Sequence, residues 1–287
     1  MHSNQQLLAI ALACIGFALF AVMSAMAKHL GDDFSTPQII FFRSLFAFLP
    51  LVFVVYGTRI GALLRTHRPG LMLARAMTGL FAMLFFFAGV TVLPLAEVVA
   101  LAFSAPIITT VMGTLFLGEK VGVHRWSAVV IGLVGVLVIV RPGTDLFTFW
   151  SFLPLASAVF YSVGVIIVRT LSKTESAASI VFYFSVVSLV ASGAIMPVYW
   201  QQPDTVQFMW LAAMGITGGV MQLCTANAIR RAEVTTLAPF EYTSLLWSAL
   251  LGYVLWDEYP GAHMWLGAAL ICGAALYIGH REAQMRQ

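Results

Sequence analysis

The chain has 287 residues, of which 61% are hydrophobic and only 9% are charged, and its mean hydropathy is +0.94. Soluble domains carry about 25% charged residues, so the composition excludes a soluble domain and predicts an all-α membrane protein. The net charge of +3 is too small to indicate nucleic acid as a partner, and the expected surroundings are the lipid bilayer.

Ten apolar segments follow one another, each near the roughly 20 residues that a helix needs to cross a bilayer. They cover residues 5–27, 35–56, 70–91, 94–117, 124–141, 148–170, 177–199, 207–229, 233–256 and 263–280. The first contains Ala25-Met26-Ala27, a small-residue pattern typical of signal-peptide cleavage. No Lys or Arg precedes this run, however, and it is long for a signal peptide, so we expect an uncleaved first helix.

The cations between these segments are distributed asymmetrically. If the N-terminus is cytoplasmic, eleven Lys and Arg residues fall in the inner connections and only two, Lys28 and Arg141, in the outer ones. Short cytoplasmic loops carry such an excess of Lys and Arg. Both termini are therefore predicted to lie in the cytoplasm.

Two stretches 139 residues apart share a pattern: Glu119–Trp126 reads EKVGVHRW and Glu258–Trp265 reads EYPGAHMW. Glu, Gly, His and Trp recur, whereas both cations of the first copy are absent from the second. With five helices in each half, the second half enters the membrane the opposite way. The first copy then lies inside the cell and the second outside, which explains why only the first keeps its positive charges.

Further matches extend this repeat along the chain. LAEVVAL at 95–101 corresponds to RAEVTTL at 231–237, Ala18 and Phe20 to Ala158 and Phe160, and Ile40 and Phe42 to Ile180 and Phe182. The predicted fold is ten transmembrane helices in two inverted five-helix repeats, residues 1–143 and 144–287. Inverted repeats are typical of secondary transporters, which bind the solute between the halves.

The stretch Leu93–Gly143 carries Pro106, the LGE of Leu117–Glu119 and a glycine-rich segment ending in RPG. With these features the chain resembles, over its whole length, two EamA repeats of the drug/metabolite transporter superfamily. The second copy departs from the pattern: LWDE at 255–258 replaces LGEK, and no proline matches Pro106. The resemblance implies ten helices and carriage of small organic solutes. Bacterial members include amino-acid exporters, and others take up riboflavin or S-adenosylmethionine.

Few ionisable residues fall within the predicted spans, where burying a charge is costly. Glu241 lies about 12 Å along its helix and Arg43 about 10 Å along its own. Glu241 is a candidate partner for a substrate ammonium or a protonatable coupling group; alternatively it pairs with Arg43 or is a protonated structural acid. Arg43 is either a carboxylate clamp or a structural strut. Arg75 lies nearer the inner surface, where its long side chain can reach lipid phosphates.

Polar and aromatic residues lie at about the same depth in the membrane as Glu241 and Arg43. Gln222 and Asn227 precede Glu241, Tyr242 follows it, and Phe103 and Ser104 lie at the equivalent depth of the first half, next to a proline that can bend its helix. Phe20 and Phe160 are candidates for the floor of a cavity. Each of these residues has a structural alternative, interhelical hydrogen bonding for the polar groups and plain packing for the aromatic rings. Glu97, at a helix start, favours capping.

No stretch matches G-x-x-x-x-G-K-[ST], so nothing in the sequence indicates ATP binding. The three cysteines lie in predicted spans and the six histidines are scattered, so we expect no disulfide framework, no structural metal and no cofactor. The pattern H-E-x-x-H is absent, and an enzyme is disfavoured. Gly132, Gly135, Gly267 and Gly273 predict close packing of the last helices of the two halves, within a monomer or across a homodimer.

These features predict a multi-pass transporter of the bacterial inner membrane for small organic metabolites. The first hypothesis for its cargo is export of amino acids, aromatic and other apolar ones included. The second is uptake of riboflavin or S-adenosylmethionine. A membrane enzyme or a channel is the alternative from another class.

Overall fold

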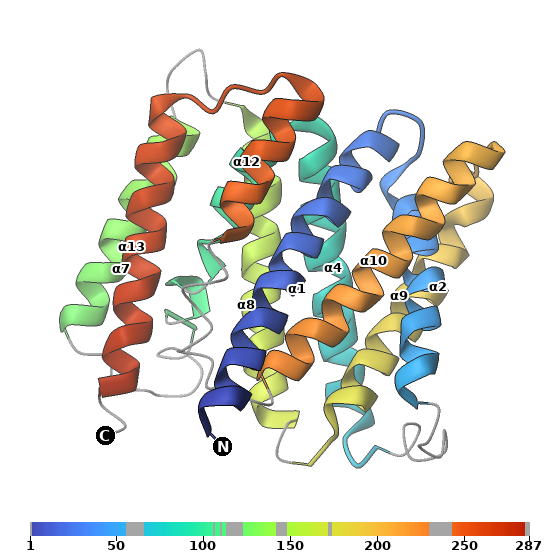
Figure 1. Cartoon of the computed structure of the whole chain (residues 1–287), viewed down its shortest axis with the longest axis horizontal. Helices are drawn as coiled ribbons and strands as arrows, with labels where there is room; N and C mark the ends of the chain where they lie inside the picture. Colours follow the sequence, from blue (N-terminus) through green and yellow to red (C-terminus); the bar gives the residue numbers. More distant parts are fainter. Residues whose placement is uncertain are drawn as a thin grey trace.

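The computed structural model describes residues 2–55, 66–105, 107–109, 111–112, 123–141, 148–171, 174–229 and 243–284, and every regular element in them is helical. The elements are α1 (His2–Leu30), α2 (Thr36–Val55), α4 (Pro69–Val92), α5 (Leu95–Ala102), α7 (Val123–Val140), η1 (Phe149–Ser151), α8 (Phe152–Leu171), α9 (Ala177–Tyr199), α10 (Thr205–Ile229), α12 (Thr243–Trp256) and α13 (Ala262–Gln284). They form a bundle of roughly parallel and antiparallel helices (Figure 1).

Five of the described helical stretches are long and apolar enough to cross a bilayer. They are Leu7–Leu30, Pro69–Val92, Phe149–Val168, Ser179–Tyr199 and Thr205–Thr225, and shorter apolar helices accompany them. Large apolar side chains also face outward: on α7, Val130, Ile131, Leu133, Val134 and Leu137 are all exposed. Exposed apolar side chains of this kind are expected where a helix faces lipid.

Eight helices close into a ring. Following the packing contacts, the order is α1, α10, α2, α9, α4, α8, α5, α12 and back to α1. Members of the N-terminal half alternate with members of the C-terminal half at every step. α1 also touches α4 across the ring, where Phe20 lies 5.3 Å from the Phe86 ring centre.

α7 and α13 form a separate pair beside this ring, at the left of Figure 1. A Cβ on Gly135 would lie 2.8 Å from the Gly267 carbonyl oxygen, and one on Gly267 would lie 2.7 Å from that of Gly135. Gly132 meets Ile107 in the same tight way. The expected close approach is confirmed for these three glycines within one chain. The prediction is wrong for Gly273, because a Cβ at that position would have no atom of a neighbouring helix within 4 Å.

The helix expected over 94–117 is interrupted. α5 ends at Ala102, and Phe103 and Ser104 form a turn before helical structure resumes. The backbone N–H of Ser104 donates to the Leu101 carbonyl, a tightened hydrogen bond, at 3.0 Å. Pro106, the residue expected to bend this helix, lies outside the described residues.

Candidate functional site

Arg43 is the most deeply buried cation among the described residues. It projects from α2, is 3% exposed, and places its guanidinium carbon 5.8 Å from the ring centre of Phe184 on α9. Its Nε and Nη1 atoms have no hydrogen-bond partner in the described part of the chain. A buried charged donor without a partner is expensive, so this group calls for an explanation.

Arg75, on α4, lies against the same ring. Its guanidinium carbon is 5.7 Å from the Phe184 ring centre, and its Nε is buried with no partner among the described residues. The sequence suggested that Arg75 reaches the lipid surface, but the structure directs it into the bundle. The reason is Gly79, one turn along α4, whose missing side chain leaves room for Arg75 and Phe184 to meet.

The predicted site residues of α5 lie at the helix break. Ser104 is 3% exposed, and its hydroxyl oxygen has no partner in the described ranges. Phe103, beside it, is buried in the main hydrophobic core. Non-helical backbone within a membrane is tolerated where it is buried in protein or lines a water-filled cavity, so the break is compatible with either role.

The repeat-matched aromatics both pack on α4, from opposite halves of the chain. Phe20 meets Phe86, while Phe160 lies 5.2 Å from the Phe81 ring centre and stacks at 5.6 Å on Phe85. The Phe160 contacts favour the packing alternative for that residue. Phe20 also packs against the buried core and remains only half-buried.

The polar residues of α10 differ in how they are satisfied. The Asn227 side chain donates to the Leu223 carbonyl of its own helix at 2.9 Å, which favours the structural alternative. Gln222, on the same helix, is half-buried. Glu241 and Tyr242 lie outside the described residues, so the pairing of Glu241 with Arg43 stays a prediction.

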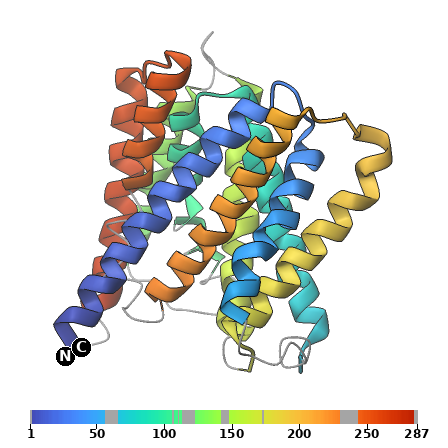
Figure 2. The same ribbon diagram turned by 45° about the vertical axis from the view of Figure 1, so that its right-hand side comes forward.

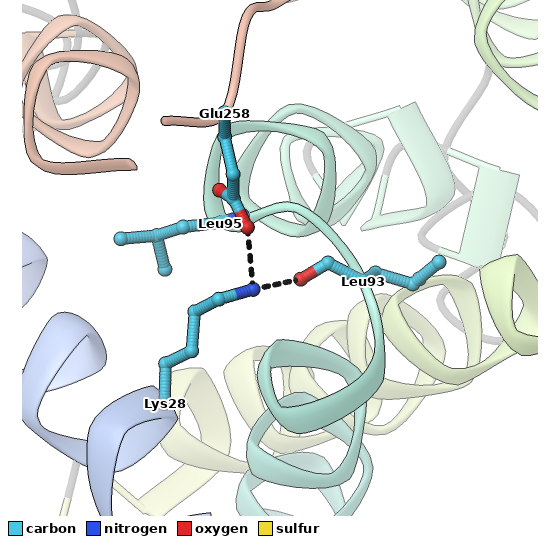
Figure 3. Close-up of polar contacts among 4 residues, drawn as sticks. All are labelled: Lys28, Leu93, Leu95 and Glu258. Carbon is cyan, nitrogen blue, oxygen red and sulfur yellow. Dashed lines mark hydrogen bonds and ion pairs between the residues drawn. The ribbon is translucent and has the colours of Figure 1, made fainter. Parts of the chain in front are cut away.

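A second charged cluster joins the two halves at one end of the bundle (Figure 3). Lys28, at the end of α1, forms a 2.7 Å ion pair with Glu258, in the connection between α12 and α13. The Lys28 ammonium also donates to the Leu93 carbonyl at 2.7 Å, and the Leu95 N–H donates to the other Glu258 oxygen at 2.9 Å. The Lys28 nitrogen lies 5.6 Å from the Trp256 ring centre.

The sequence placed Lys28 and Glu258 on the same side of the membrane but did not predict that they pair. Nearby, the Ser151 hydroxyl donates a hydrogen bond to the Glu97 carboxylate at 3.2 Å. Glu97 therefore has a side-chain partner in addition to its favourable place in the first turn of α5. At the opposite end of the bundle, Thr66 and the His67 N–H each donate to Glu175 at 2.8 Å. No three metal-ligating side chains converge within the described residues.

Comparison with known proteins adds a family. The model of the EamA-like transporter family matches residues 7–141 and again 148–279. A crystal structure aligns over 99% of this chain and 99% of its own, with a TM-score of 0.66 and 16% identity, which shows a shared fold.

Three curated relatives cover nearly the whole chain. An S-adenosylmethionine uptake transporter of Rickettsia felis is 28% identical and covers 93% of this chain and 92% of its own length. A riboflavin transporter of Vibrio cholerae is 28% identical, with 92% and 90% covered. A pseudopaline exporter of Pseudomonas aeruginosa is 29% identical, with 94% and 95% covered.

Proposed function

The chain belongs to the EamA-like transporter family, and from this premise we propose that it is a secondary transporter of small organic metabolites in the bacterial inner membrane. That it is a multi-pass membrane transporter rather than an enzyme follows from the family and from its apolar helices. The observation that carries the proposal is the double match to the family model, which covers nearly the whole chain.

The proposed architecture is ten transmembrane helices in two inverted repeats, residues 1–143 and 144–287. The alternation of the halves around the eight-helix ring supports this proposal. If a two-fold axis in the membrane plane exchanges α1 with α8, α2 with α9, α4 with α10 and α5 with α12, the order of the ring is preserved. Two inverted repeats interlocked in this way enclose a central path, as secondary transporters require.

We place both termini in the cytoplasm. α1 begins and α13 ends at the same end of the bundle (Figures 1 and 2), as an even number of spans demands. The excess of Lys and Arg in the connections at that end supports the orientation. Lys28 and Glu258 then close the outer end of the path.

The first candidate for the cargo is an exported amino acid, with aromatic and other apolar amino acids included. A second candidate, uptake of S-adenosylmethionine or riboflavin, is favoured by the names of two of the relatives. S-adenosylmethionine carries the ammonium and carboxylate of an amino acid, so it shares a head group with the first candidate. Riboflavin has no carboxylate.

We propose that the path is enclosed by α1, α4 and α5 with their repeat mates α8, α10 and α12, and that α7 and α13 support it. Arg43 reaches this path from α2, where its Nε faces Gly218 of α10. The residues assigned to the path are Glu241, Tyr242, Gln222, Asn227, Ser104, Phe103, Arg43, Phe20 and Phe160. The unsatisfied Ser104 hydroxyl and the unpaired Arg43 guanidinium support this assignment most directly. Glu241 is assigned to a substrate ammonium or to a coupling proton.

The test is counterflow in liposomes of purified protein, with a panel of amino acids, S-adenosylmethionine and riboflavin. Saturable counterflow is expected of a carrier, whereas a channel gives none and an enzyme converts the solute. Ser104→Phe should abolish counterflow, while Val130→Phe, on the exposed face of α7, should not. Equal counterflow by both variants would remove Ser104 from the path.

Glu241→Gln separates the roles left open for that residue. Loss of transport, or of its pH dependence, in a well-folded variant supports a substrate or proton role. A marked fall in melting temperature instead supports a structural pairing. Wild-type transport with a wild-type pH profile would rule out the substrate and proton roles together.

A further inference from the structure

Two arginines and one aromatic ring form a cationic site inside the bundle. Arg43 and Arg75 come from α2 and α4, and both guanidinium groups lie within 6 Å of Phe184 on α9, which packs between those helices. Phe184 is itself buried, 8% exposed. The ring attracts each cation, but a contact with an aromatic face offers no hydrogen-bond acceptor for the Nε and Nη groups.

No acid satisfies these cations in the described part of the chain. Among those residues Lys28 forms an ion pair with Glu258, at the end of the bundle. Arg43 Nε and Nη1 and Arg75 Nε are buried without a partner there. Two guanidinium groups held against one ring, with buried N–H groups that have no partner in the described residues, favour the binding of an anion, because an isolated buried charge is strongly destabilising.

Three glycines and one buried hydroxyl group surround the two guanidinium groups. A Cβ on Gly79 would lie 2.5 Å from Arg75 Nη1, one on Gly164 3.6 Å from the same atom, and one on Gly218 3.3 Å from Arg43 Nε. Glycine at these three positions, on three helices, lets the helix backbones approach the guanidinium groups closely. Ser188 follows Phe184 by one turn on α9, and its buried hydroxyl has no partner among the described residues.

We infer that Arg43 and Arg75, with Phe184 between them, form the site that binds the carboxylate of the transported solute. The inference rests on the proposed transport function and narrows its substrate to carboxylate-bearing metabolites. The planar fork of a guanidinium matches a carboxylate in two parallel hydrogen bonds. Arg43 is 3% exposed and about 10 Å along α2 from its start, too deep for a lipid phosphate to reach.

The two arginines lie at different depths. Arg75 is six residues from the start of α4, about 9 Å from the inner end, and Arg43 is about 10 Å from the outer end of α2. A carboxylate that enters from the inner side therefore meets Arg75 first, and one that enters from the outer side meets Arg43 first. In either direction it can then be passed from one arginine to the other. The site selects amino acids and S-adenosylmethionine over riboflavin.

The binding test uses purified full-length protein in detergent and its melting temperature at constant ionic strength. Benzoate should raise the melting temperature, and neutral benzamide, of the same shape, should not. Arg75→Gln should weaken benzoate binding at least about tenfold, the loss expected for a hydrogen bond to a charged group. Arg68→Gln, an exposed arginine just before α4, is the charge-matched control and should bind benzoate as the wild type does.

Removing a buried charge can itself cause misfolding, so two further variants keep both positive charges. Arg43→Lys retains the charge but loses the fork, and Gly79→Ala puts a methyl group against Arg75 Nη1 and Phe184. Both should weaken benzoate binding, whereas Gly70→Ala on the same helix, with nothing within 4 Å, should not. Equal responses to benzoate and benzamide in the wild type, or an unchanged benzoate response in Arg75→Gln and Gly79→Ala, would overturn the inference.

Counterflow distinguishes failure of this inference from failure of the proposed function. A wild-type protein that moves no solute of the panel contradicts the transport proposal, whatever its benzoate response. A protein that transports an amino acid and its amide equally well, with Arg75→Gln unchanged, transports without this site. Preference for the acid over its amide in the wild type, lost in Arg75→Gln, supports the inference.

Discussion

Neutralising Glu258 should loosen the end of the bundle that Lys28 closes. Glu258→Gln keeps the side-chain size and an oxygen that can accept from the Leu95 N–H, but it removes the charge that pairs with Lys28. The Lys28 ammonium then keeps only the Leu93 carbonyl and the Trp256 ring. The perturbation therefore isolates the ion pair from the rest of the cluster.

The magnitude follows from the burial of the two groups. An exposed ion pair contributes about 0–1 kcal/mol, and removing one partner of a fully buried pair costs about 3–5 kcal/mol. The Lys28 and Glu258 side chains are 13% and 19% exposed, so the loss should lie between these limits, at about 2 kcal/mol. Such a loss shifts the ratio of closed to open outer ends about 30-fold.

Labelling of a single cysteine measures this opening. Ser24, one turn before Lys28 on α1, is fully buried. In a background without the three native cysteines, Ser24→Cys should react faster with an impermeant maleimide from outside when Glu258→Gln is added. Asp257→Asn, which neutralises the neighbouring exposed carboxylate and keeps a residue tolerant of its positive φ of 52°, should leave the rate unchanged. Equal labelling rates in the two variants would refute the assignment of the ion pair to outer closure.

Three other changes test separate parts of the structure. Gly135→Ala should lower the melting temperature by separating α7 from α13, while Gly273→Ala, with open space around it, should not. Desolvation alone would raise the pKa of Glu175, but hydrogen bonds from Thr66 and His67 lower it, so its stabilising effect should fade as pH falls through that lowered pKa and be absent in Glu175→Gln, as melting curves against pH would show. Single cysteines at Arg65 and Asp204 should label from opposite sides of the membrane; equal labelling from outside would mean that the predicted orientation is wrong.

Long apolar runs made most of the helices predictable. The expected 177–199 segment matches α9 residue for residue, because the polar stretches on either side limit where the chain can leave the apolar phase. The prediction of one continuous helix over 94–117 was wrong at residues 103–104, because the apolar composition of this segment gives no sign of the break. A proline at 106 has no N–H for the carbonyl four residues earlier, that of Ala102, and α5 ends at Ala102. The proline predicted a bend, but the residue at which the helix ends depended on packing.

The candidate site was predictable only where depth along a helix decides burial. Arg43 lies seven residues from the start of α2 and is buried, as its position suggested. Arg75 lies about as far from a helix start, yet its direction depends on Phe184, more than 100 residues away, and on the glycine that admits that ring. The Lys28–Glu258 pair likewise joins residues from opposite halves of the chain. Contacts of this range require the fold, because neither partner carries a local signal for the other.

In the proposed transporter, Lys28 and Glu258 close the path, whereas Arg43 and Arg75 bind the solute. Lys28 and Glu258 satisfy each other and remain partly exposed, so both can rehydrate when the outer end opens. Arg43 is almost fully buried and has no acid within the described ranges, so in the proposed site its charge is satisfied by the carboxylate of a bound solute. A closing contribution of about 2 kcal/mol keeps the open state a minor but accessible population. The binding free energy of a micromolar solute, about 8 kcal/mol, is large enough that a modest preference for either state reverses this balance.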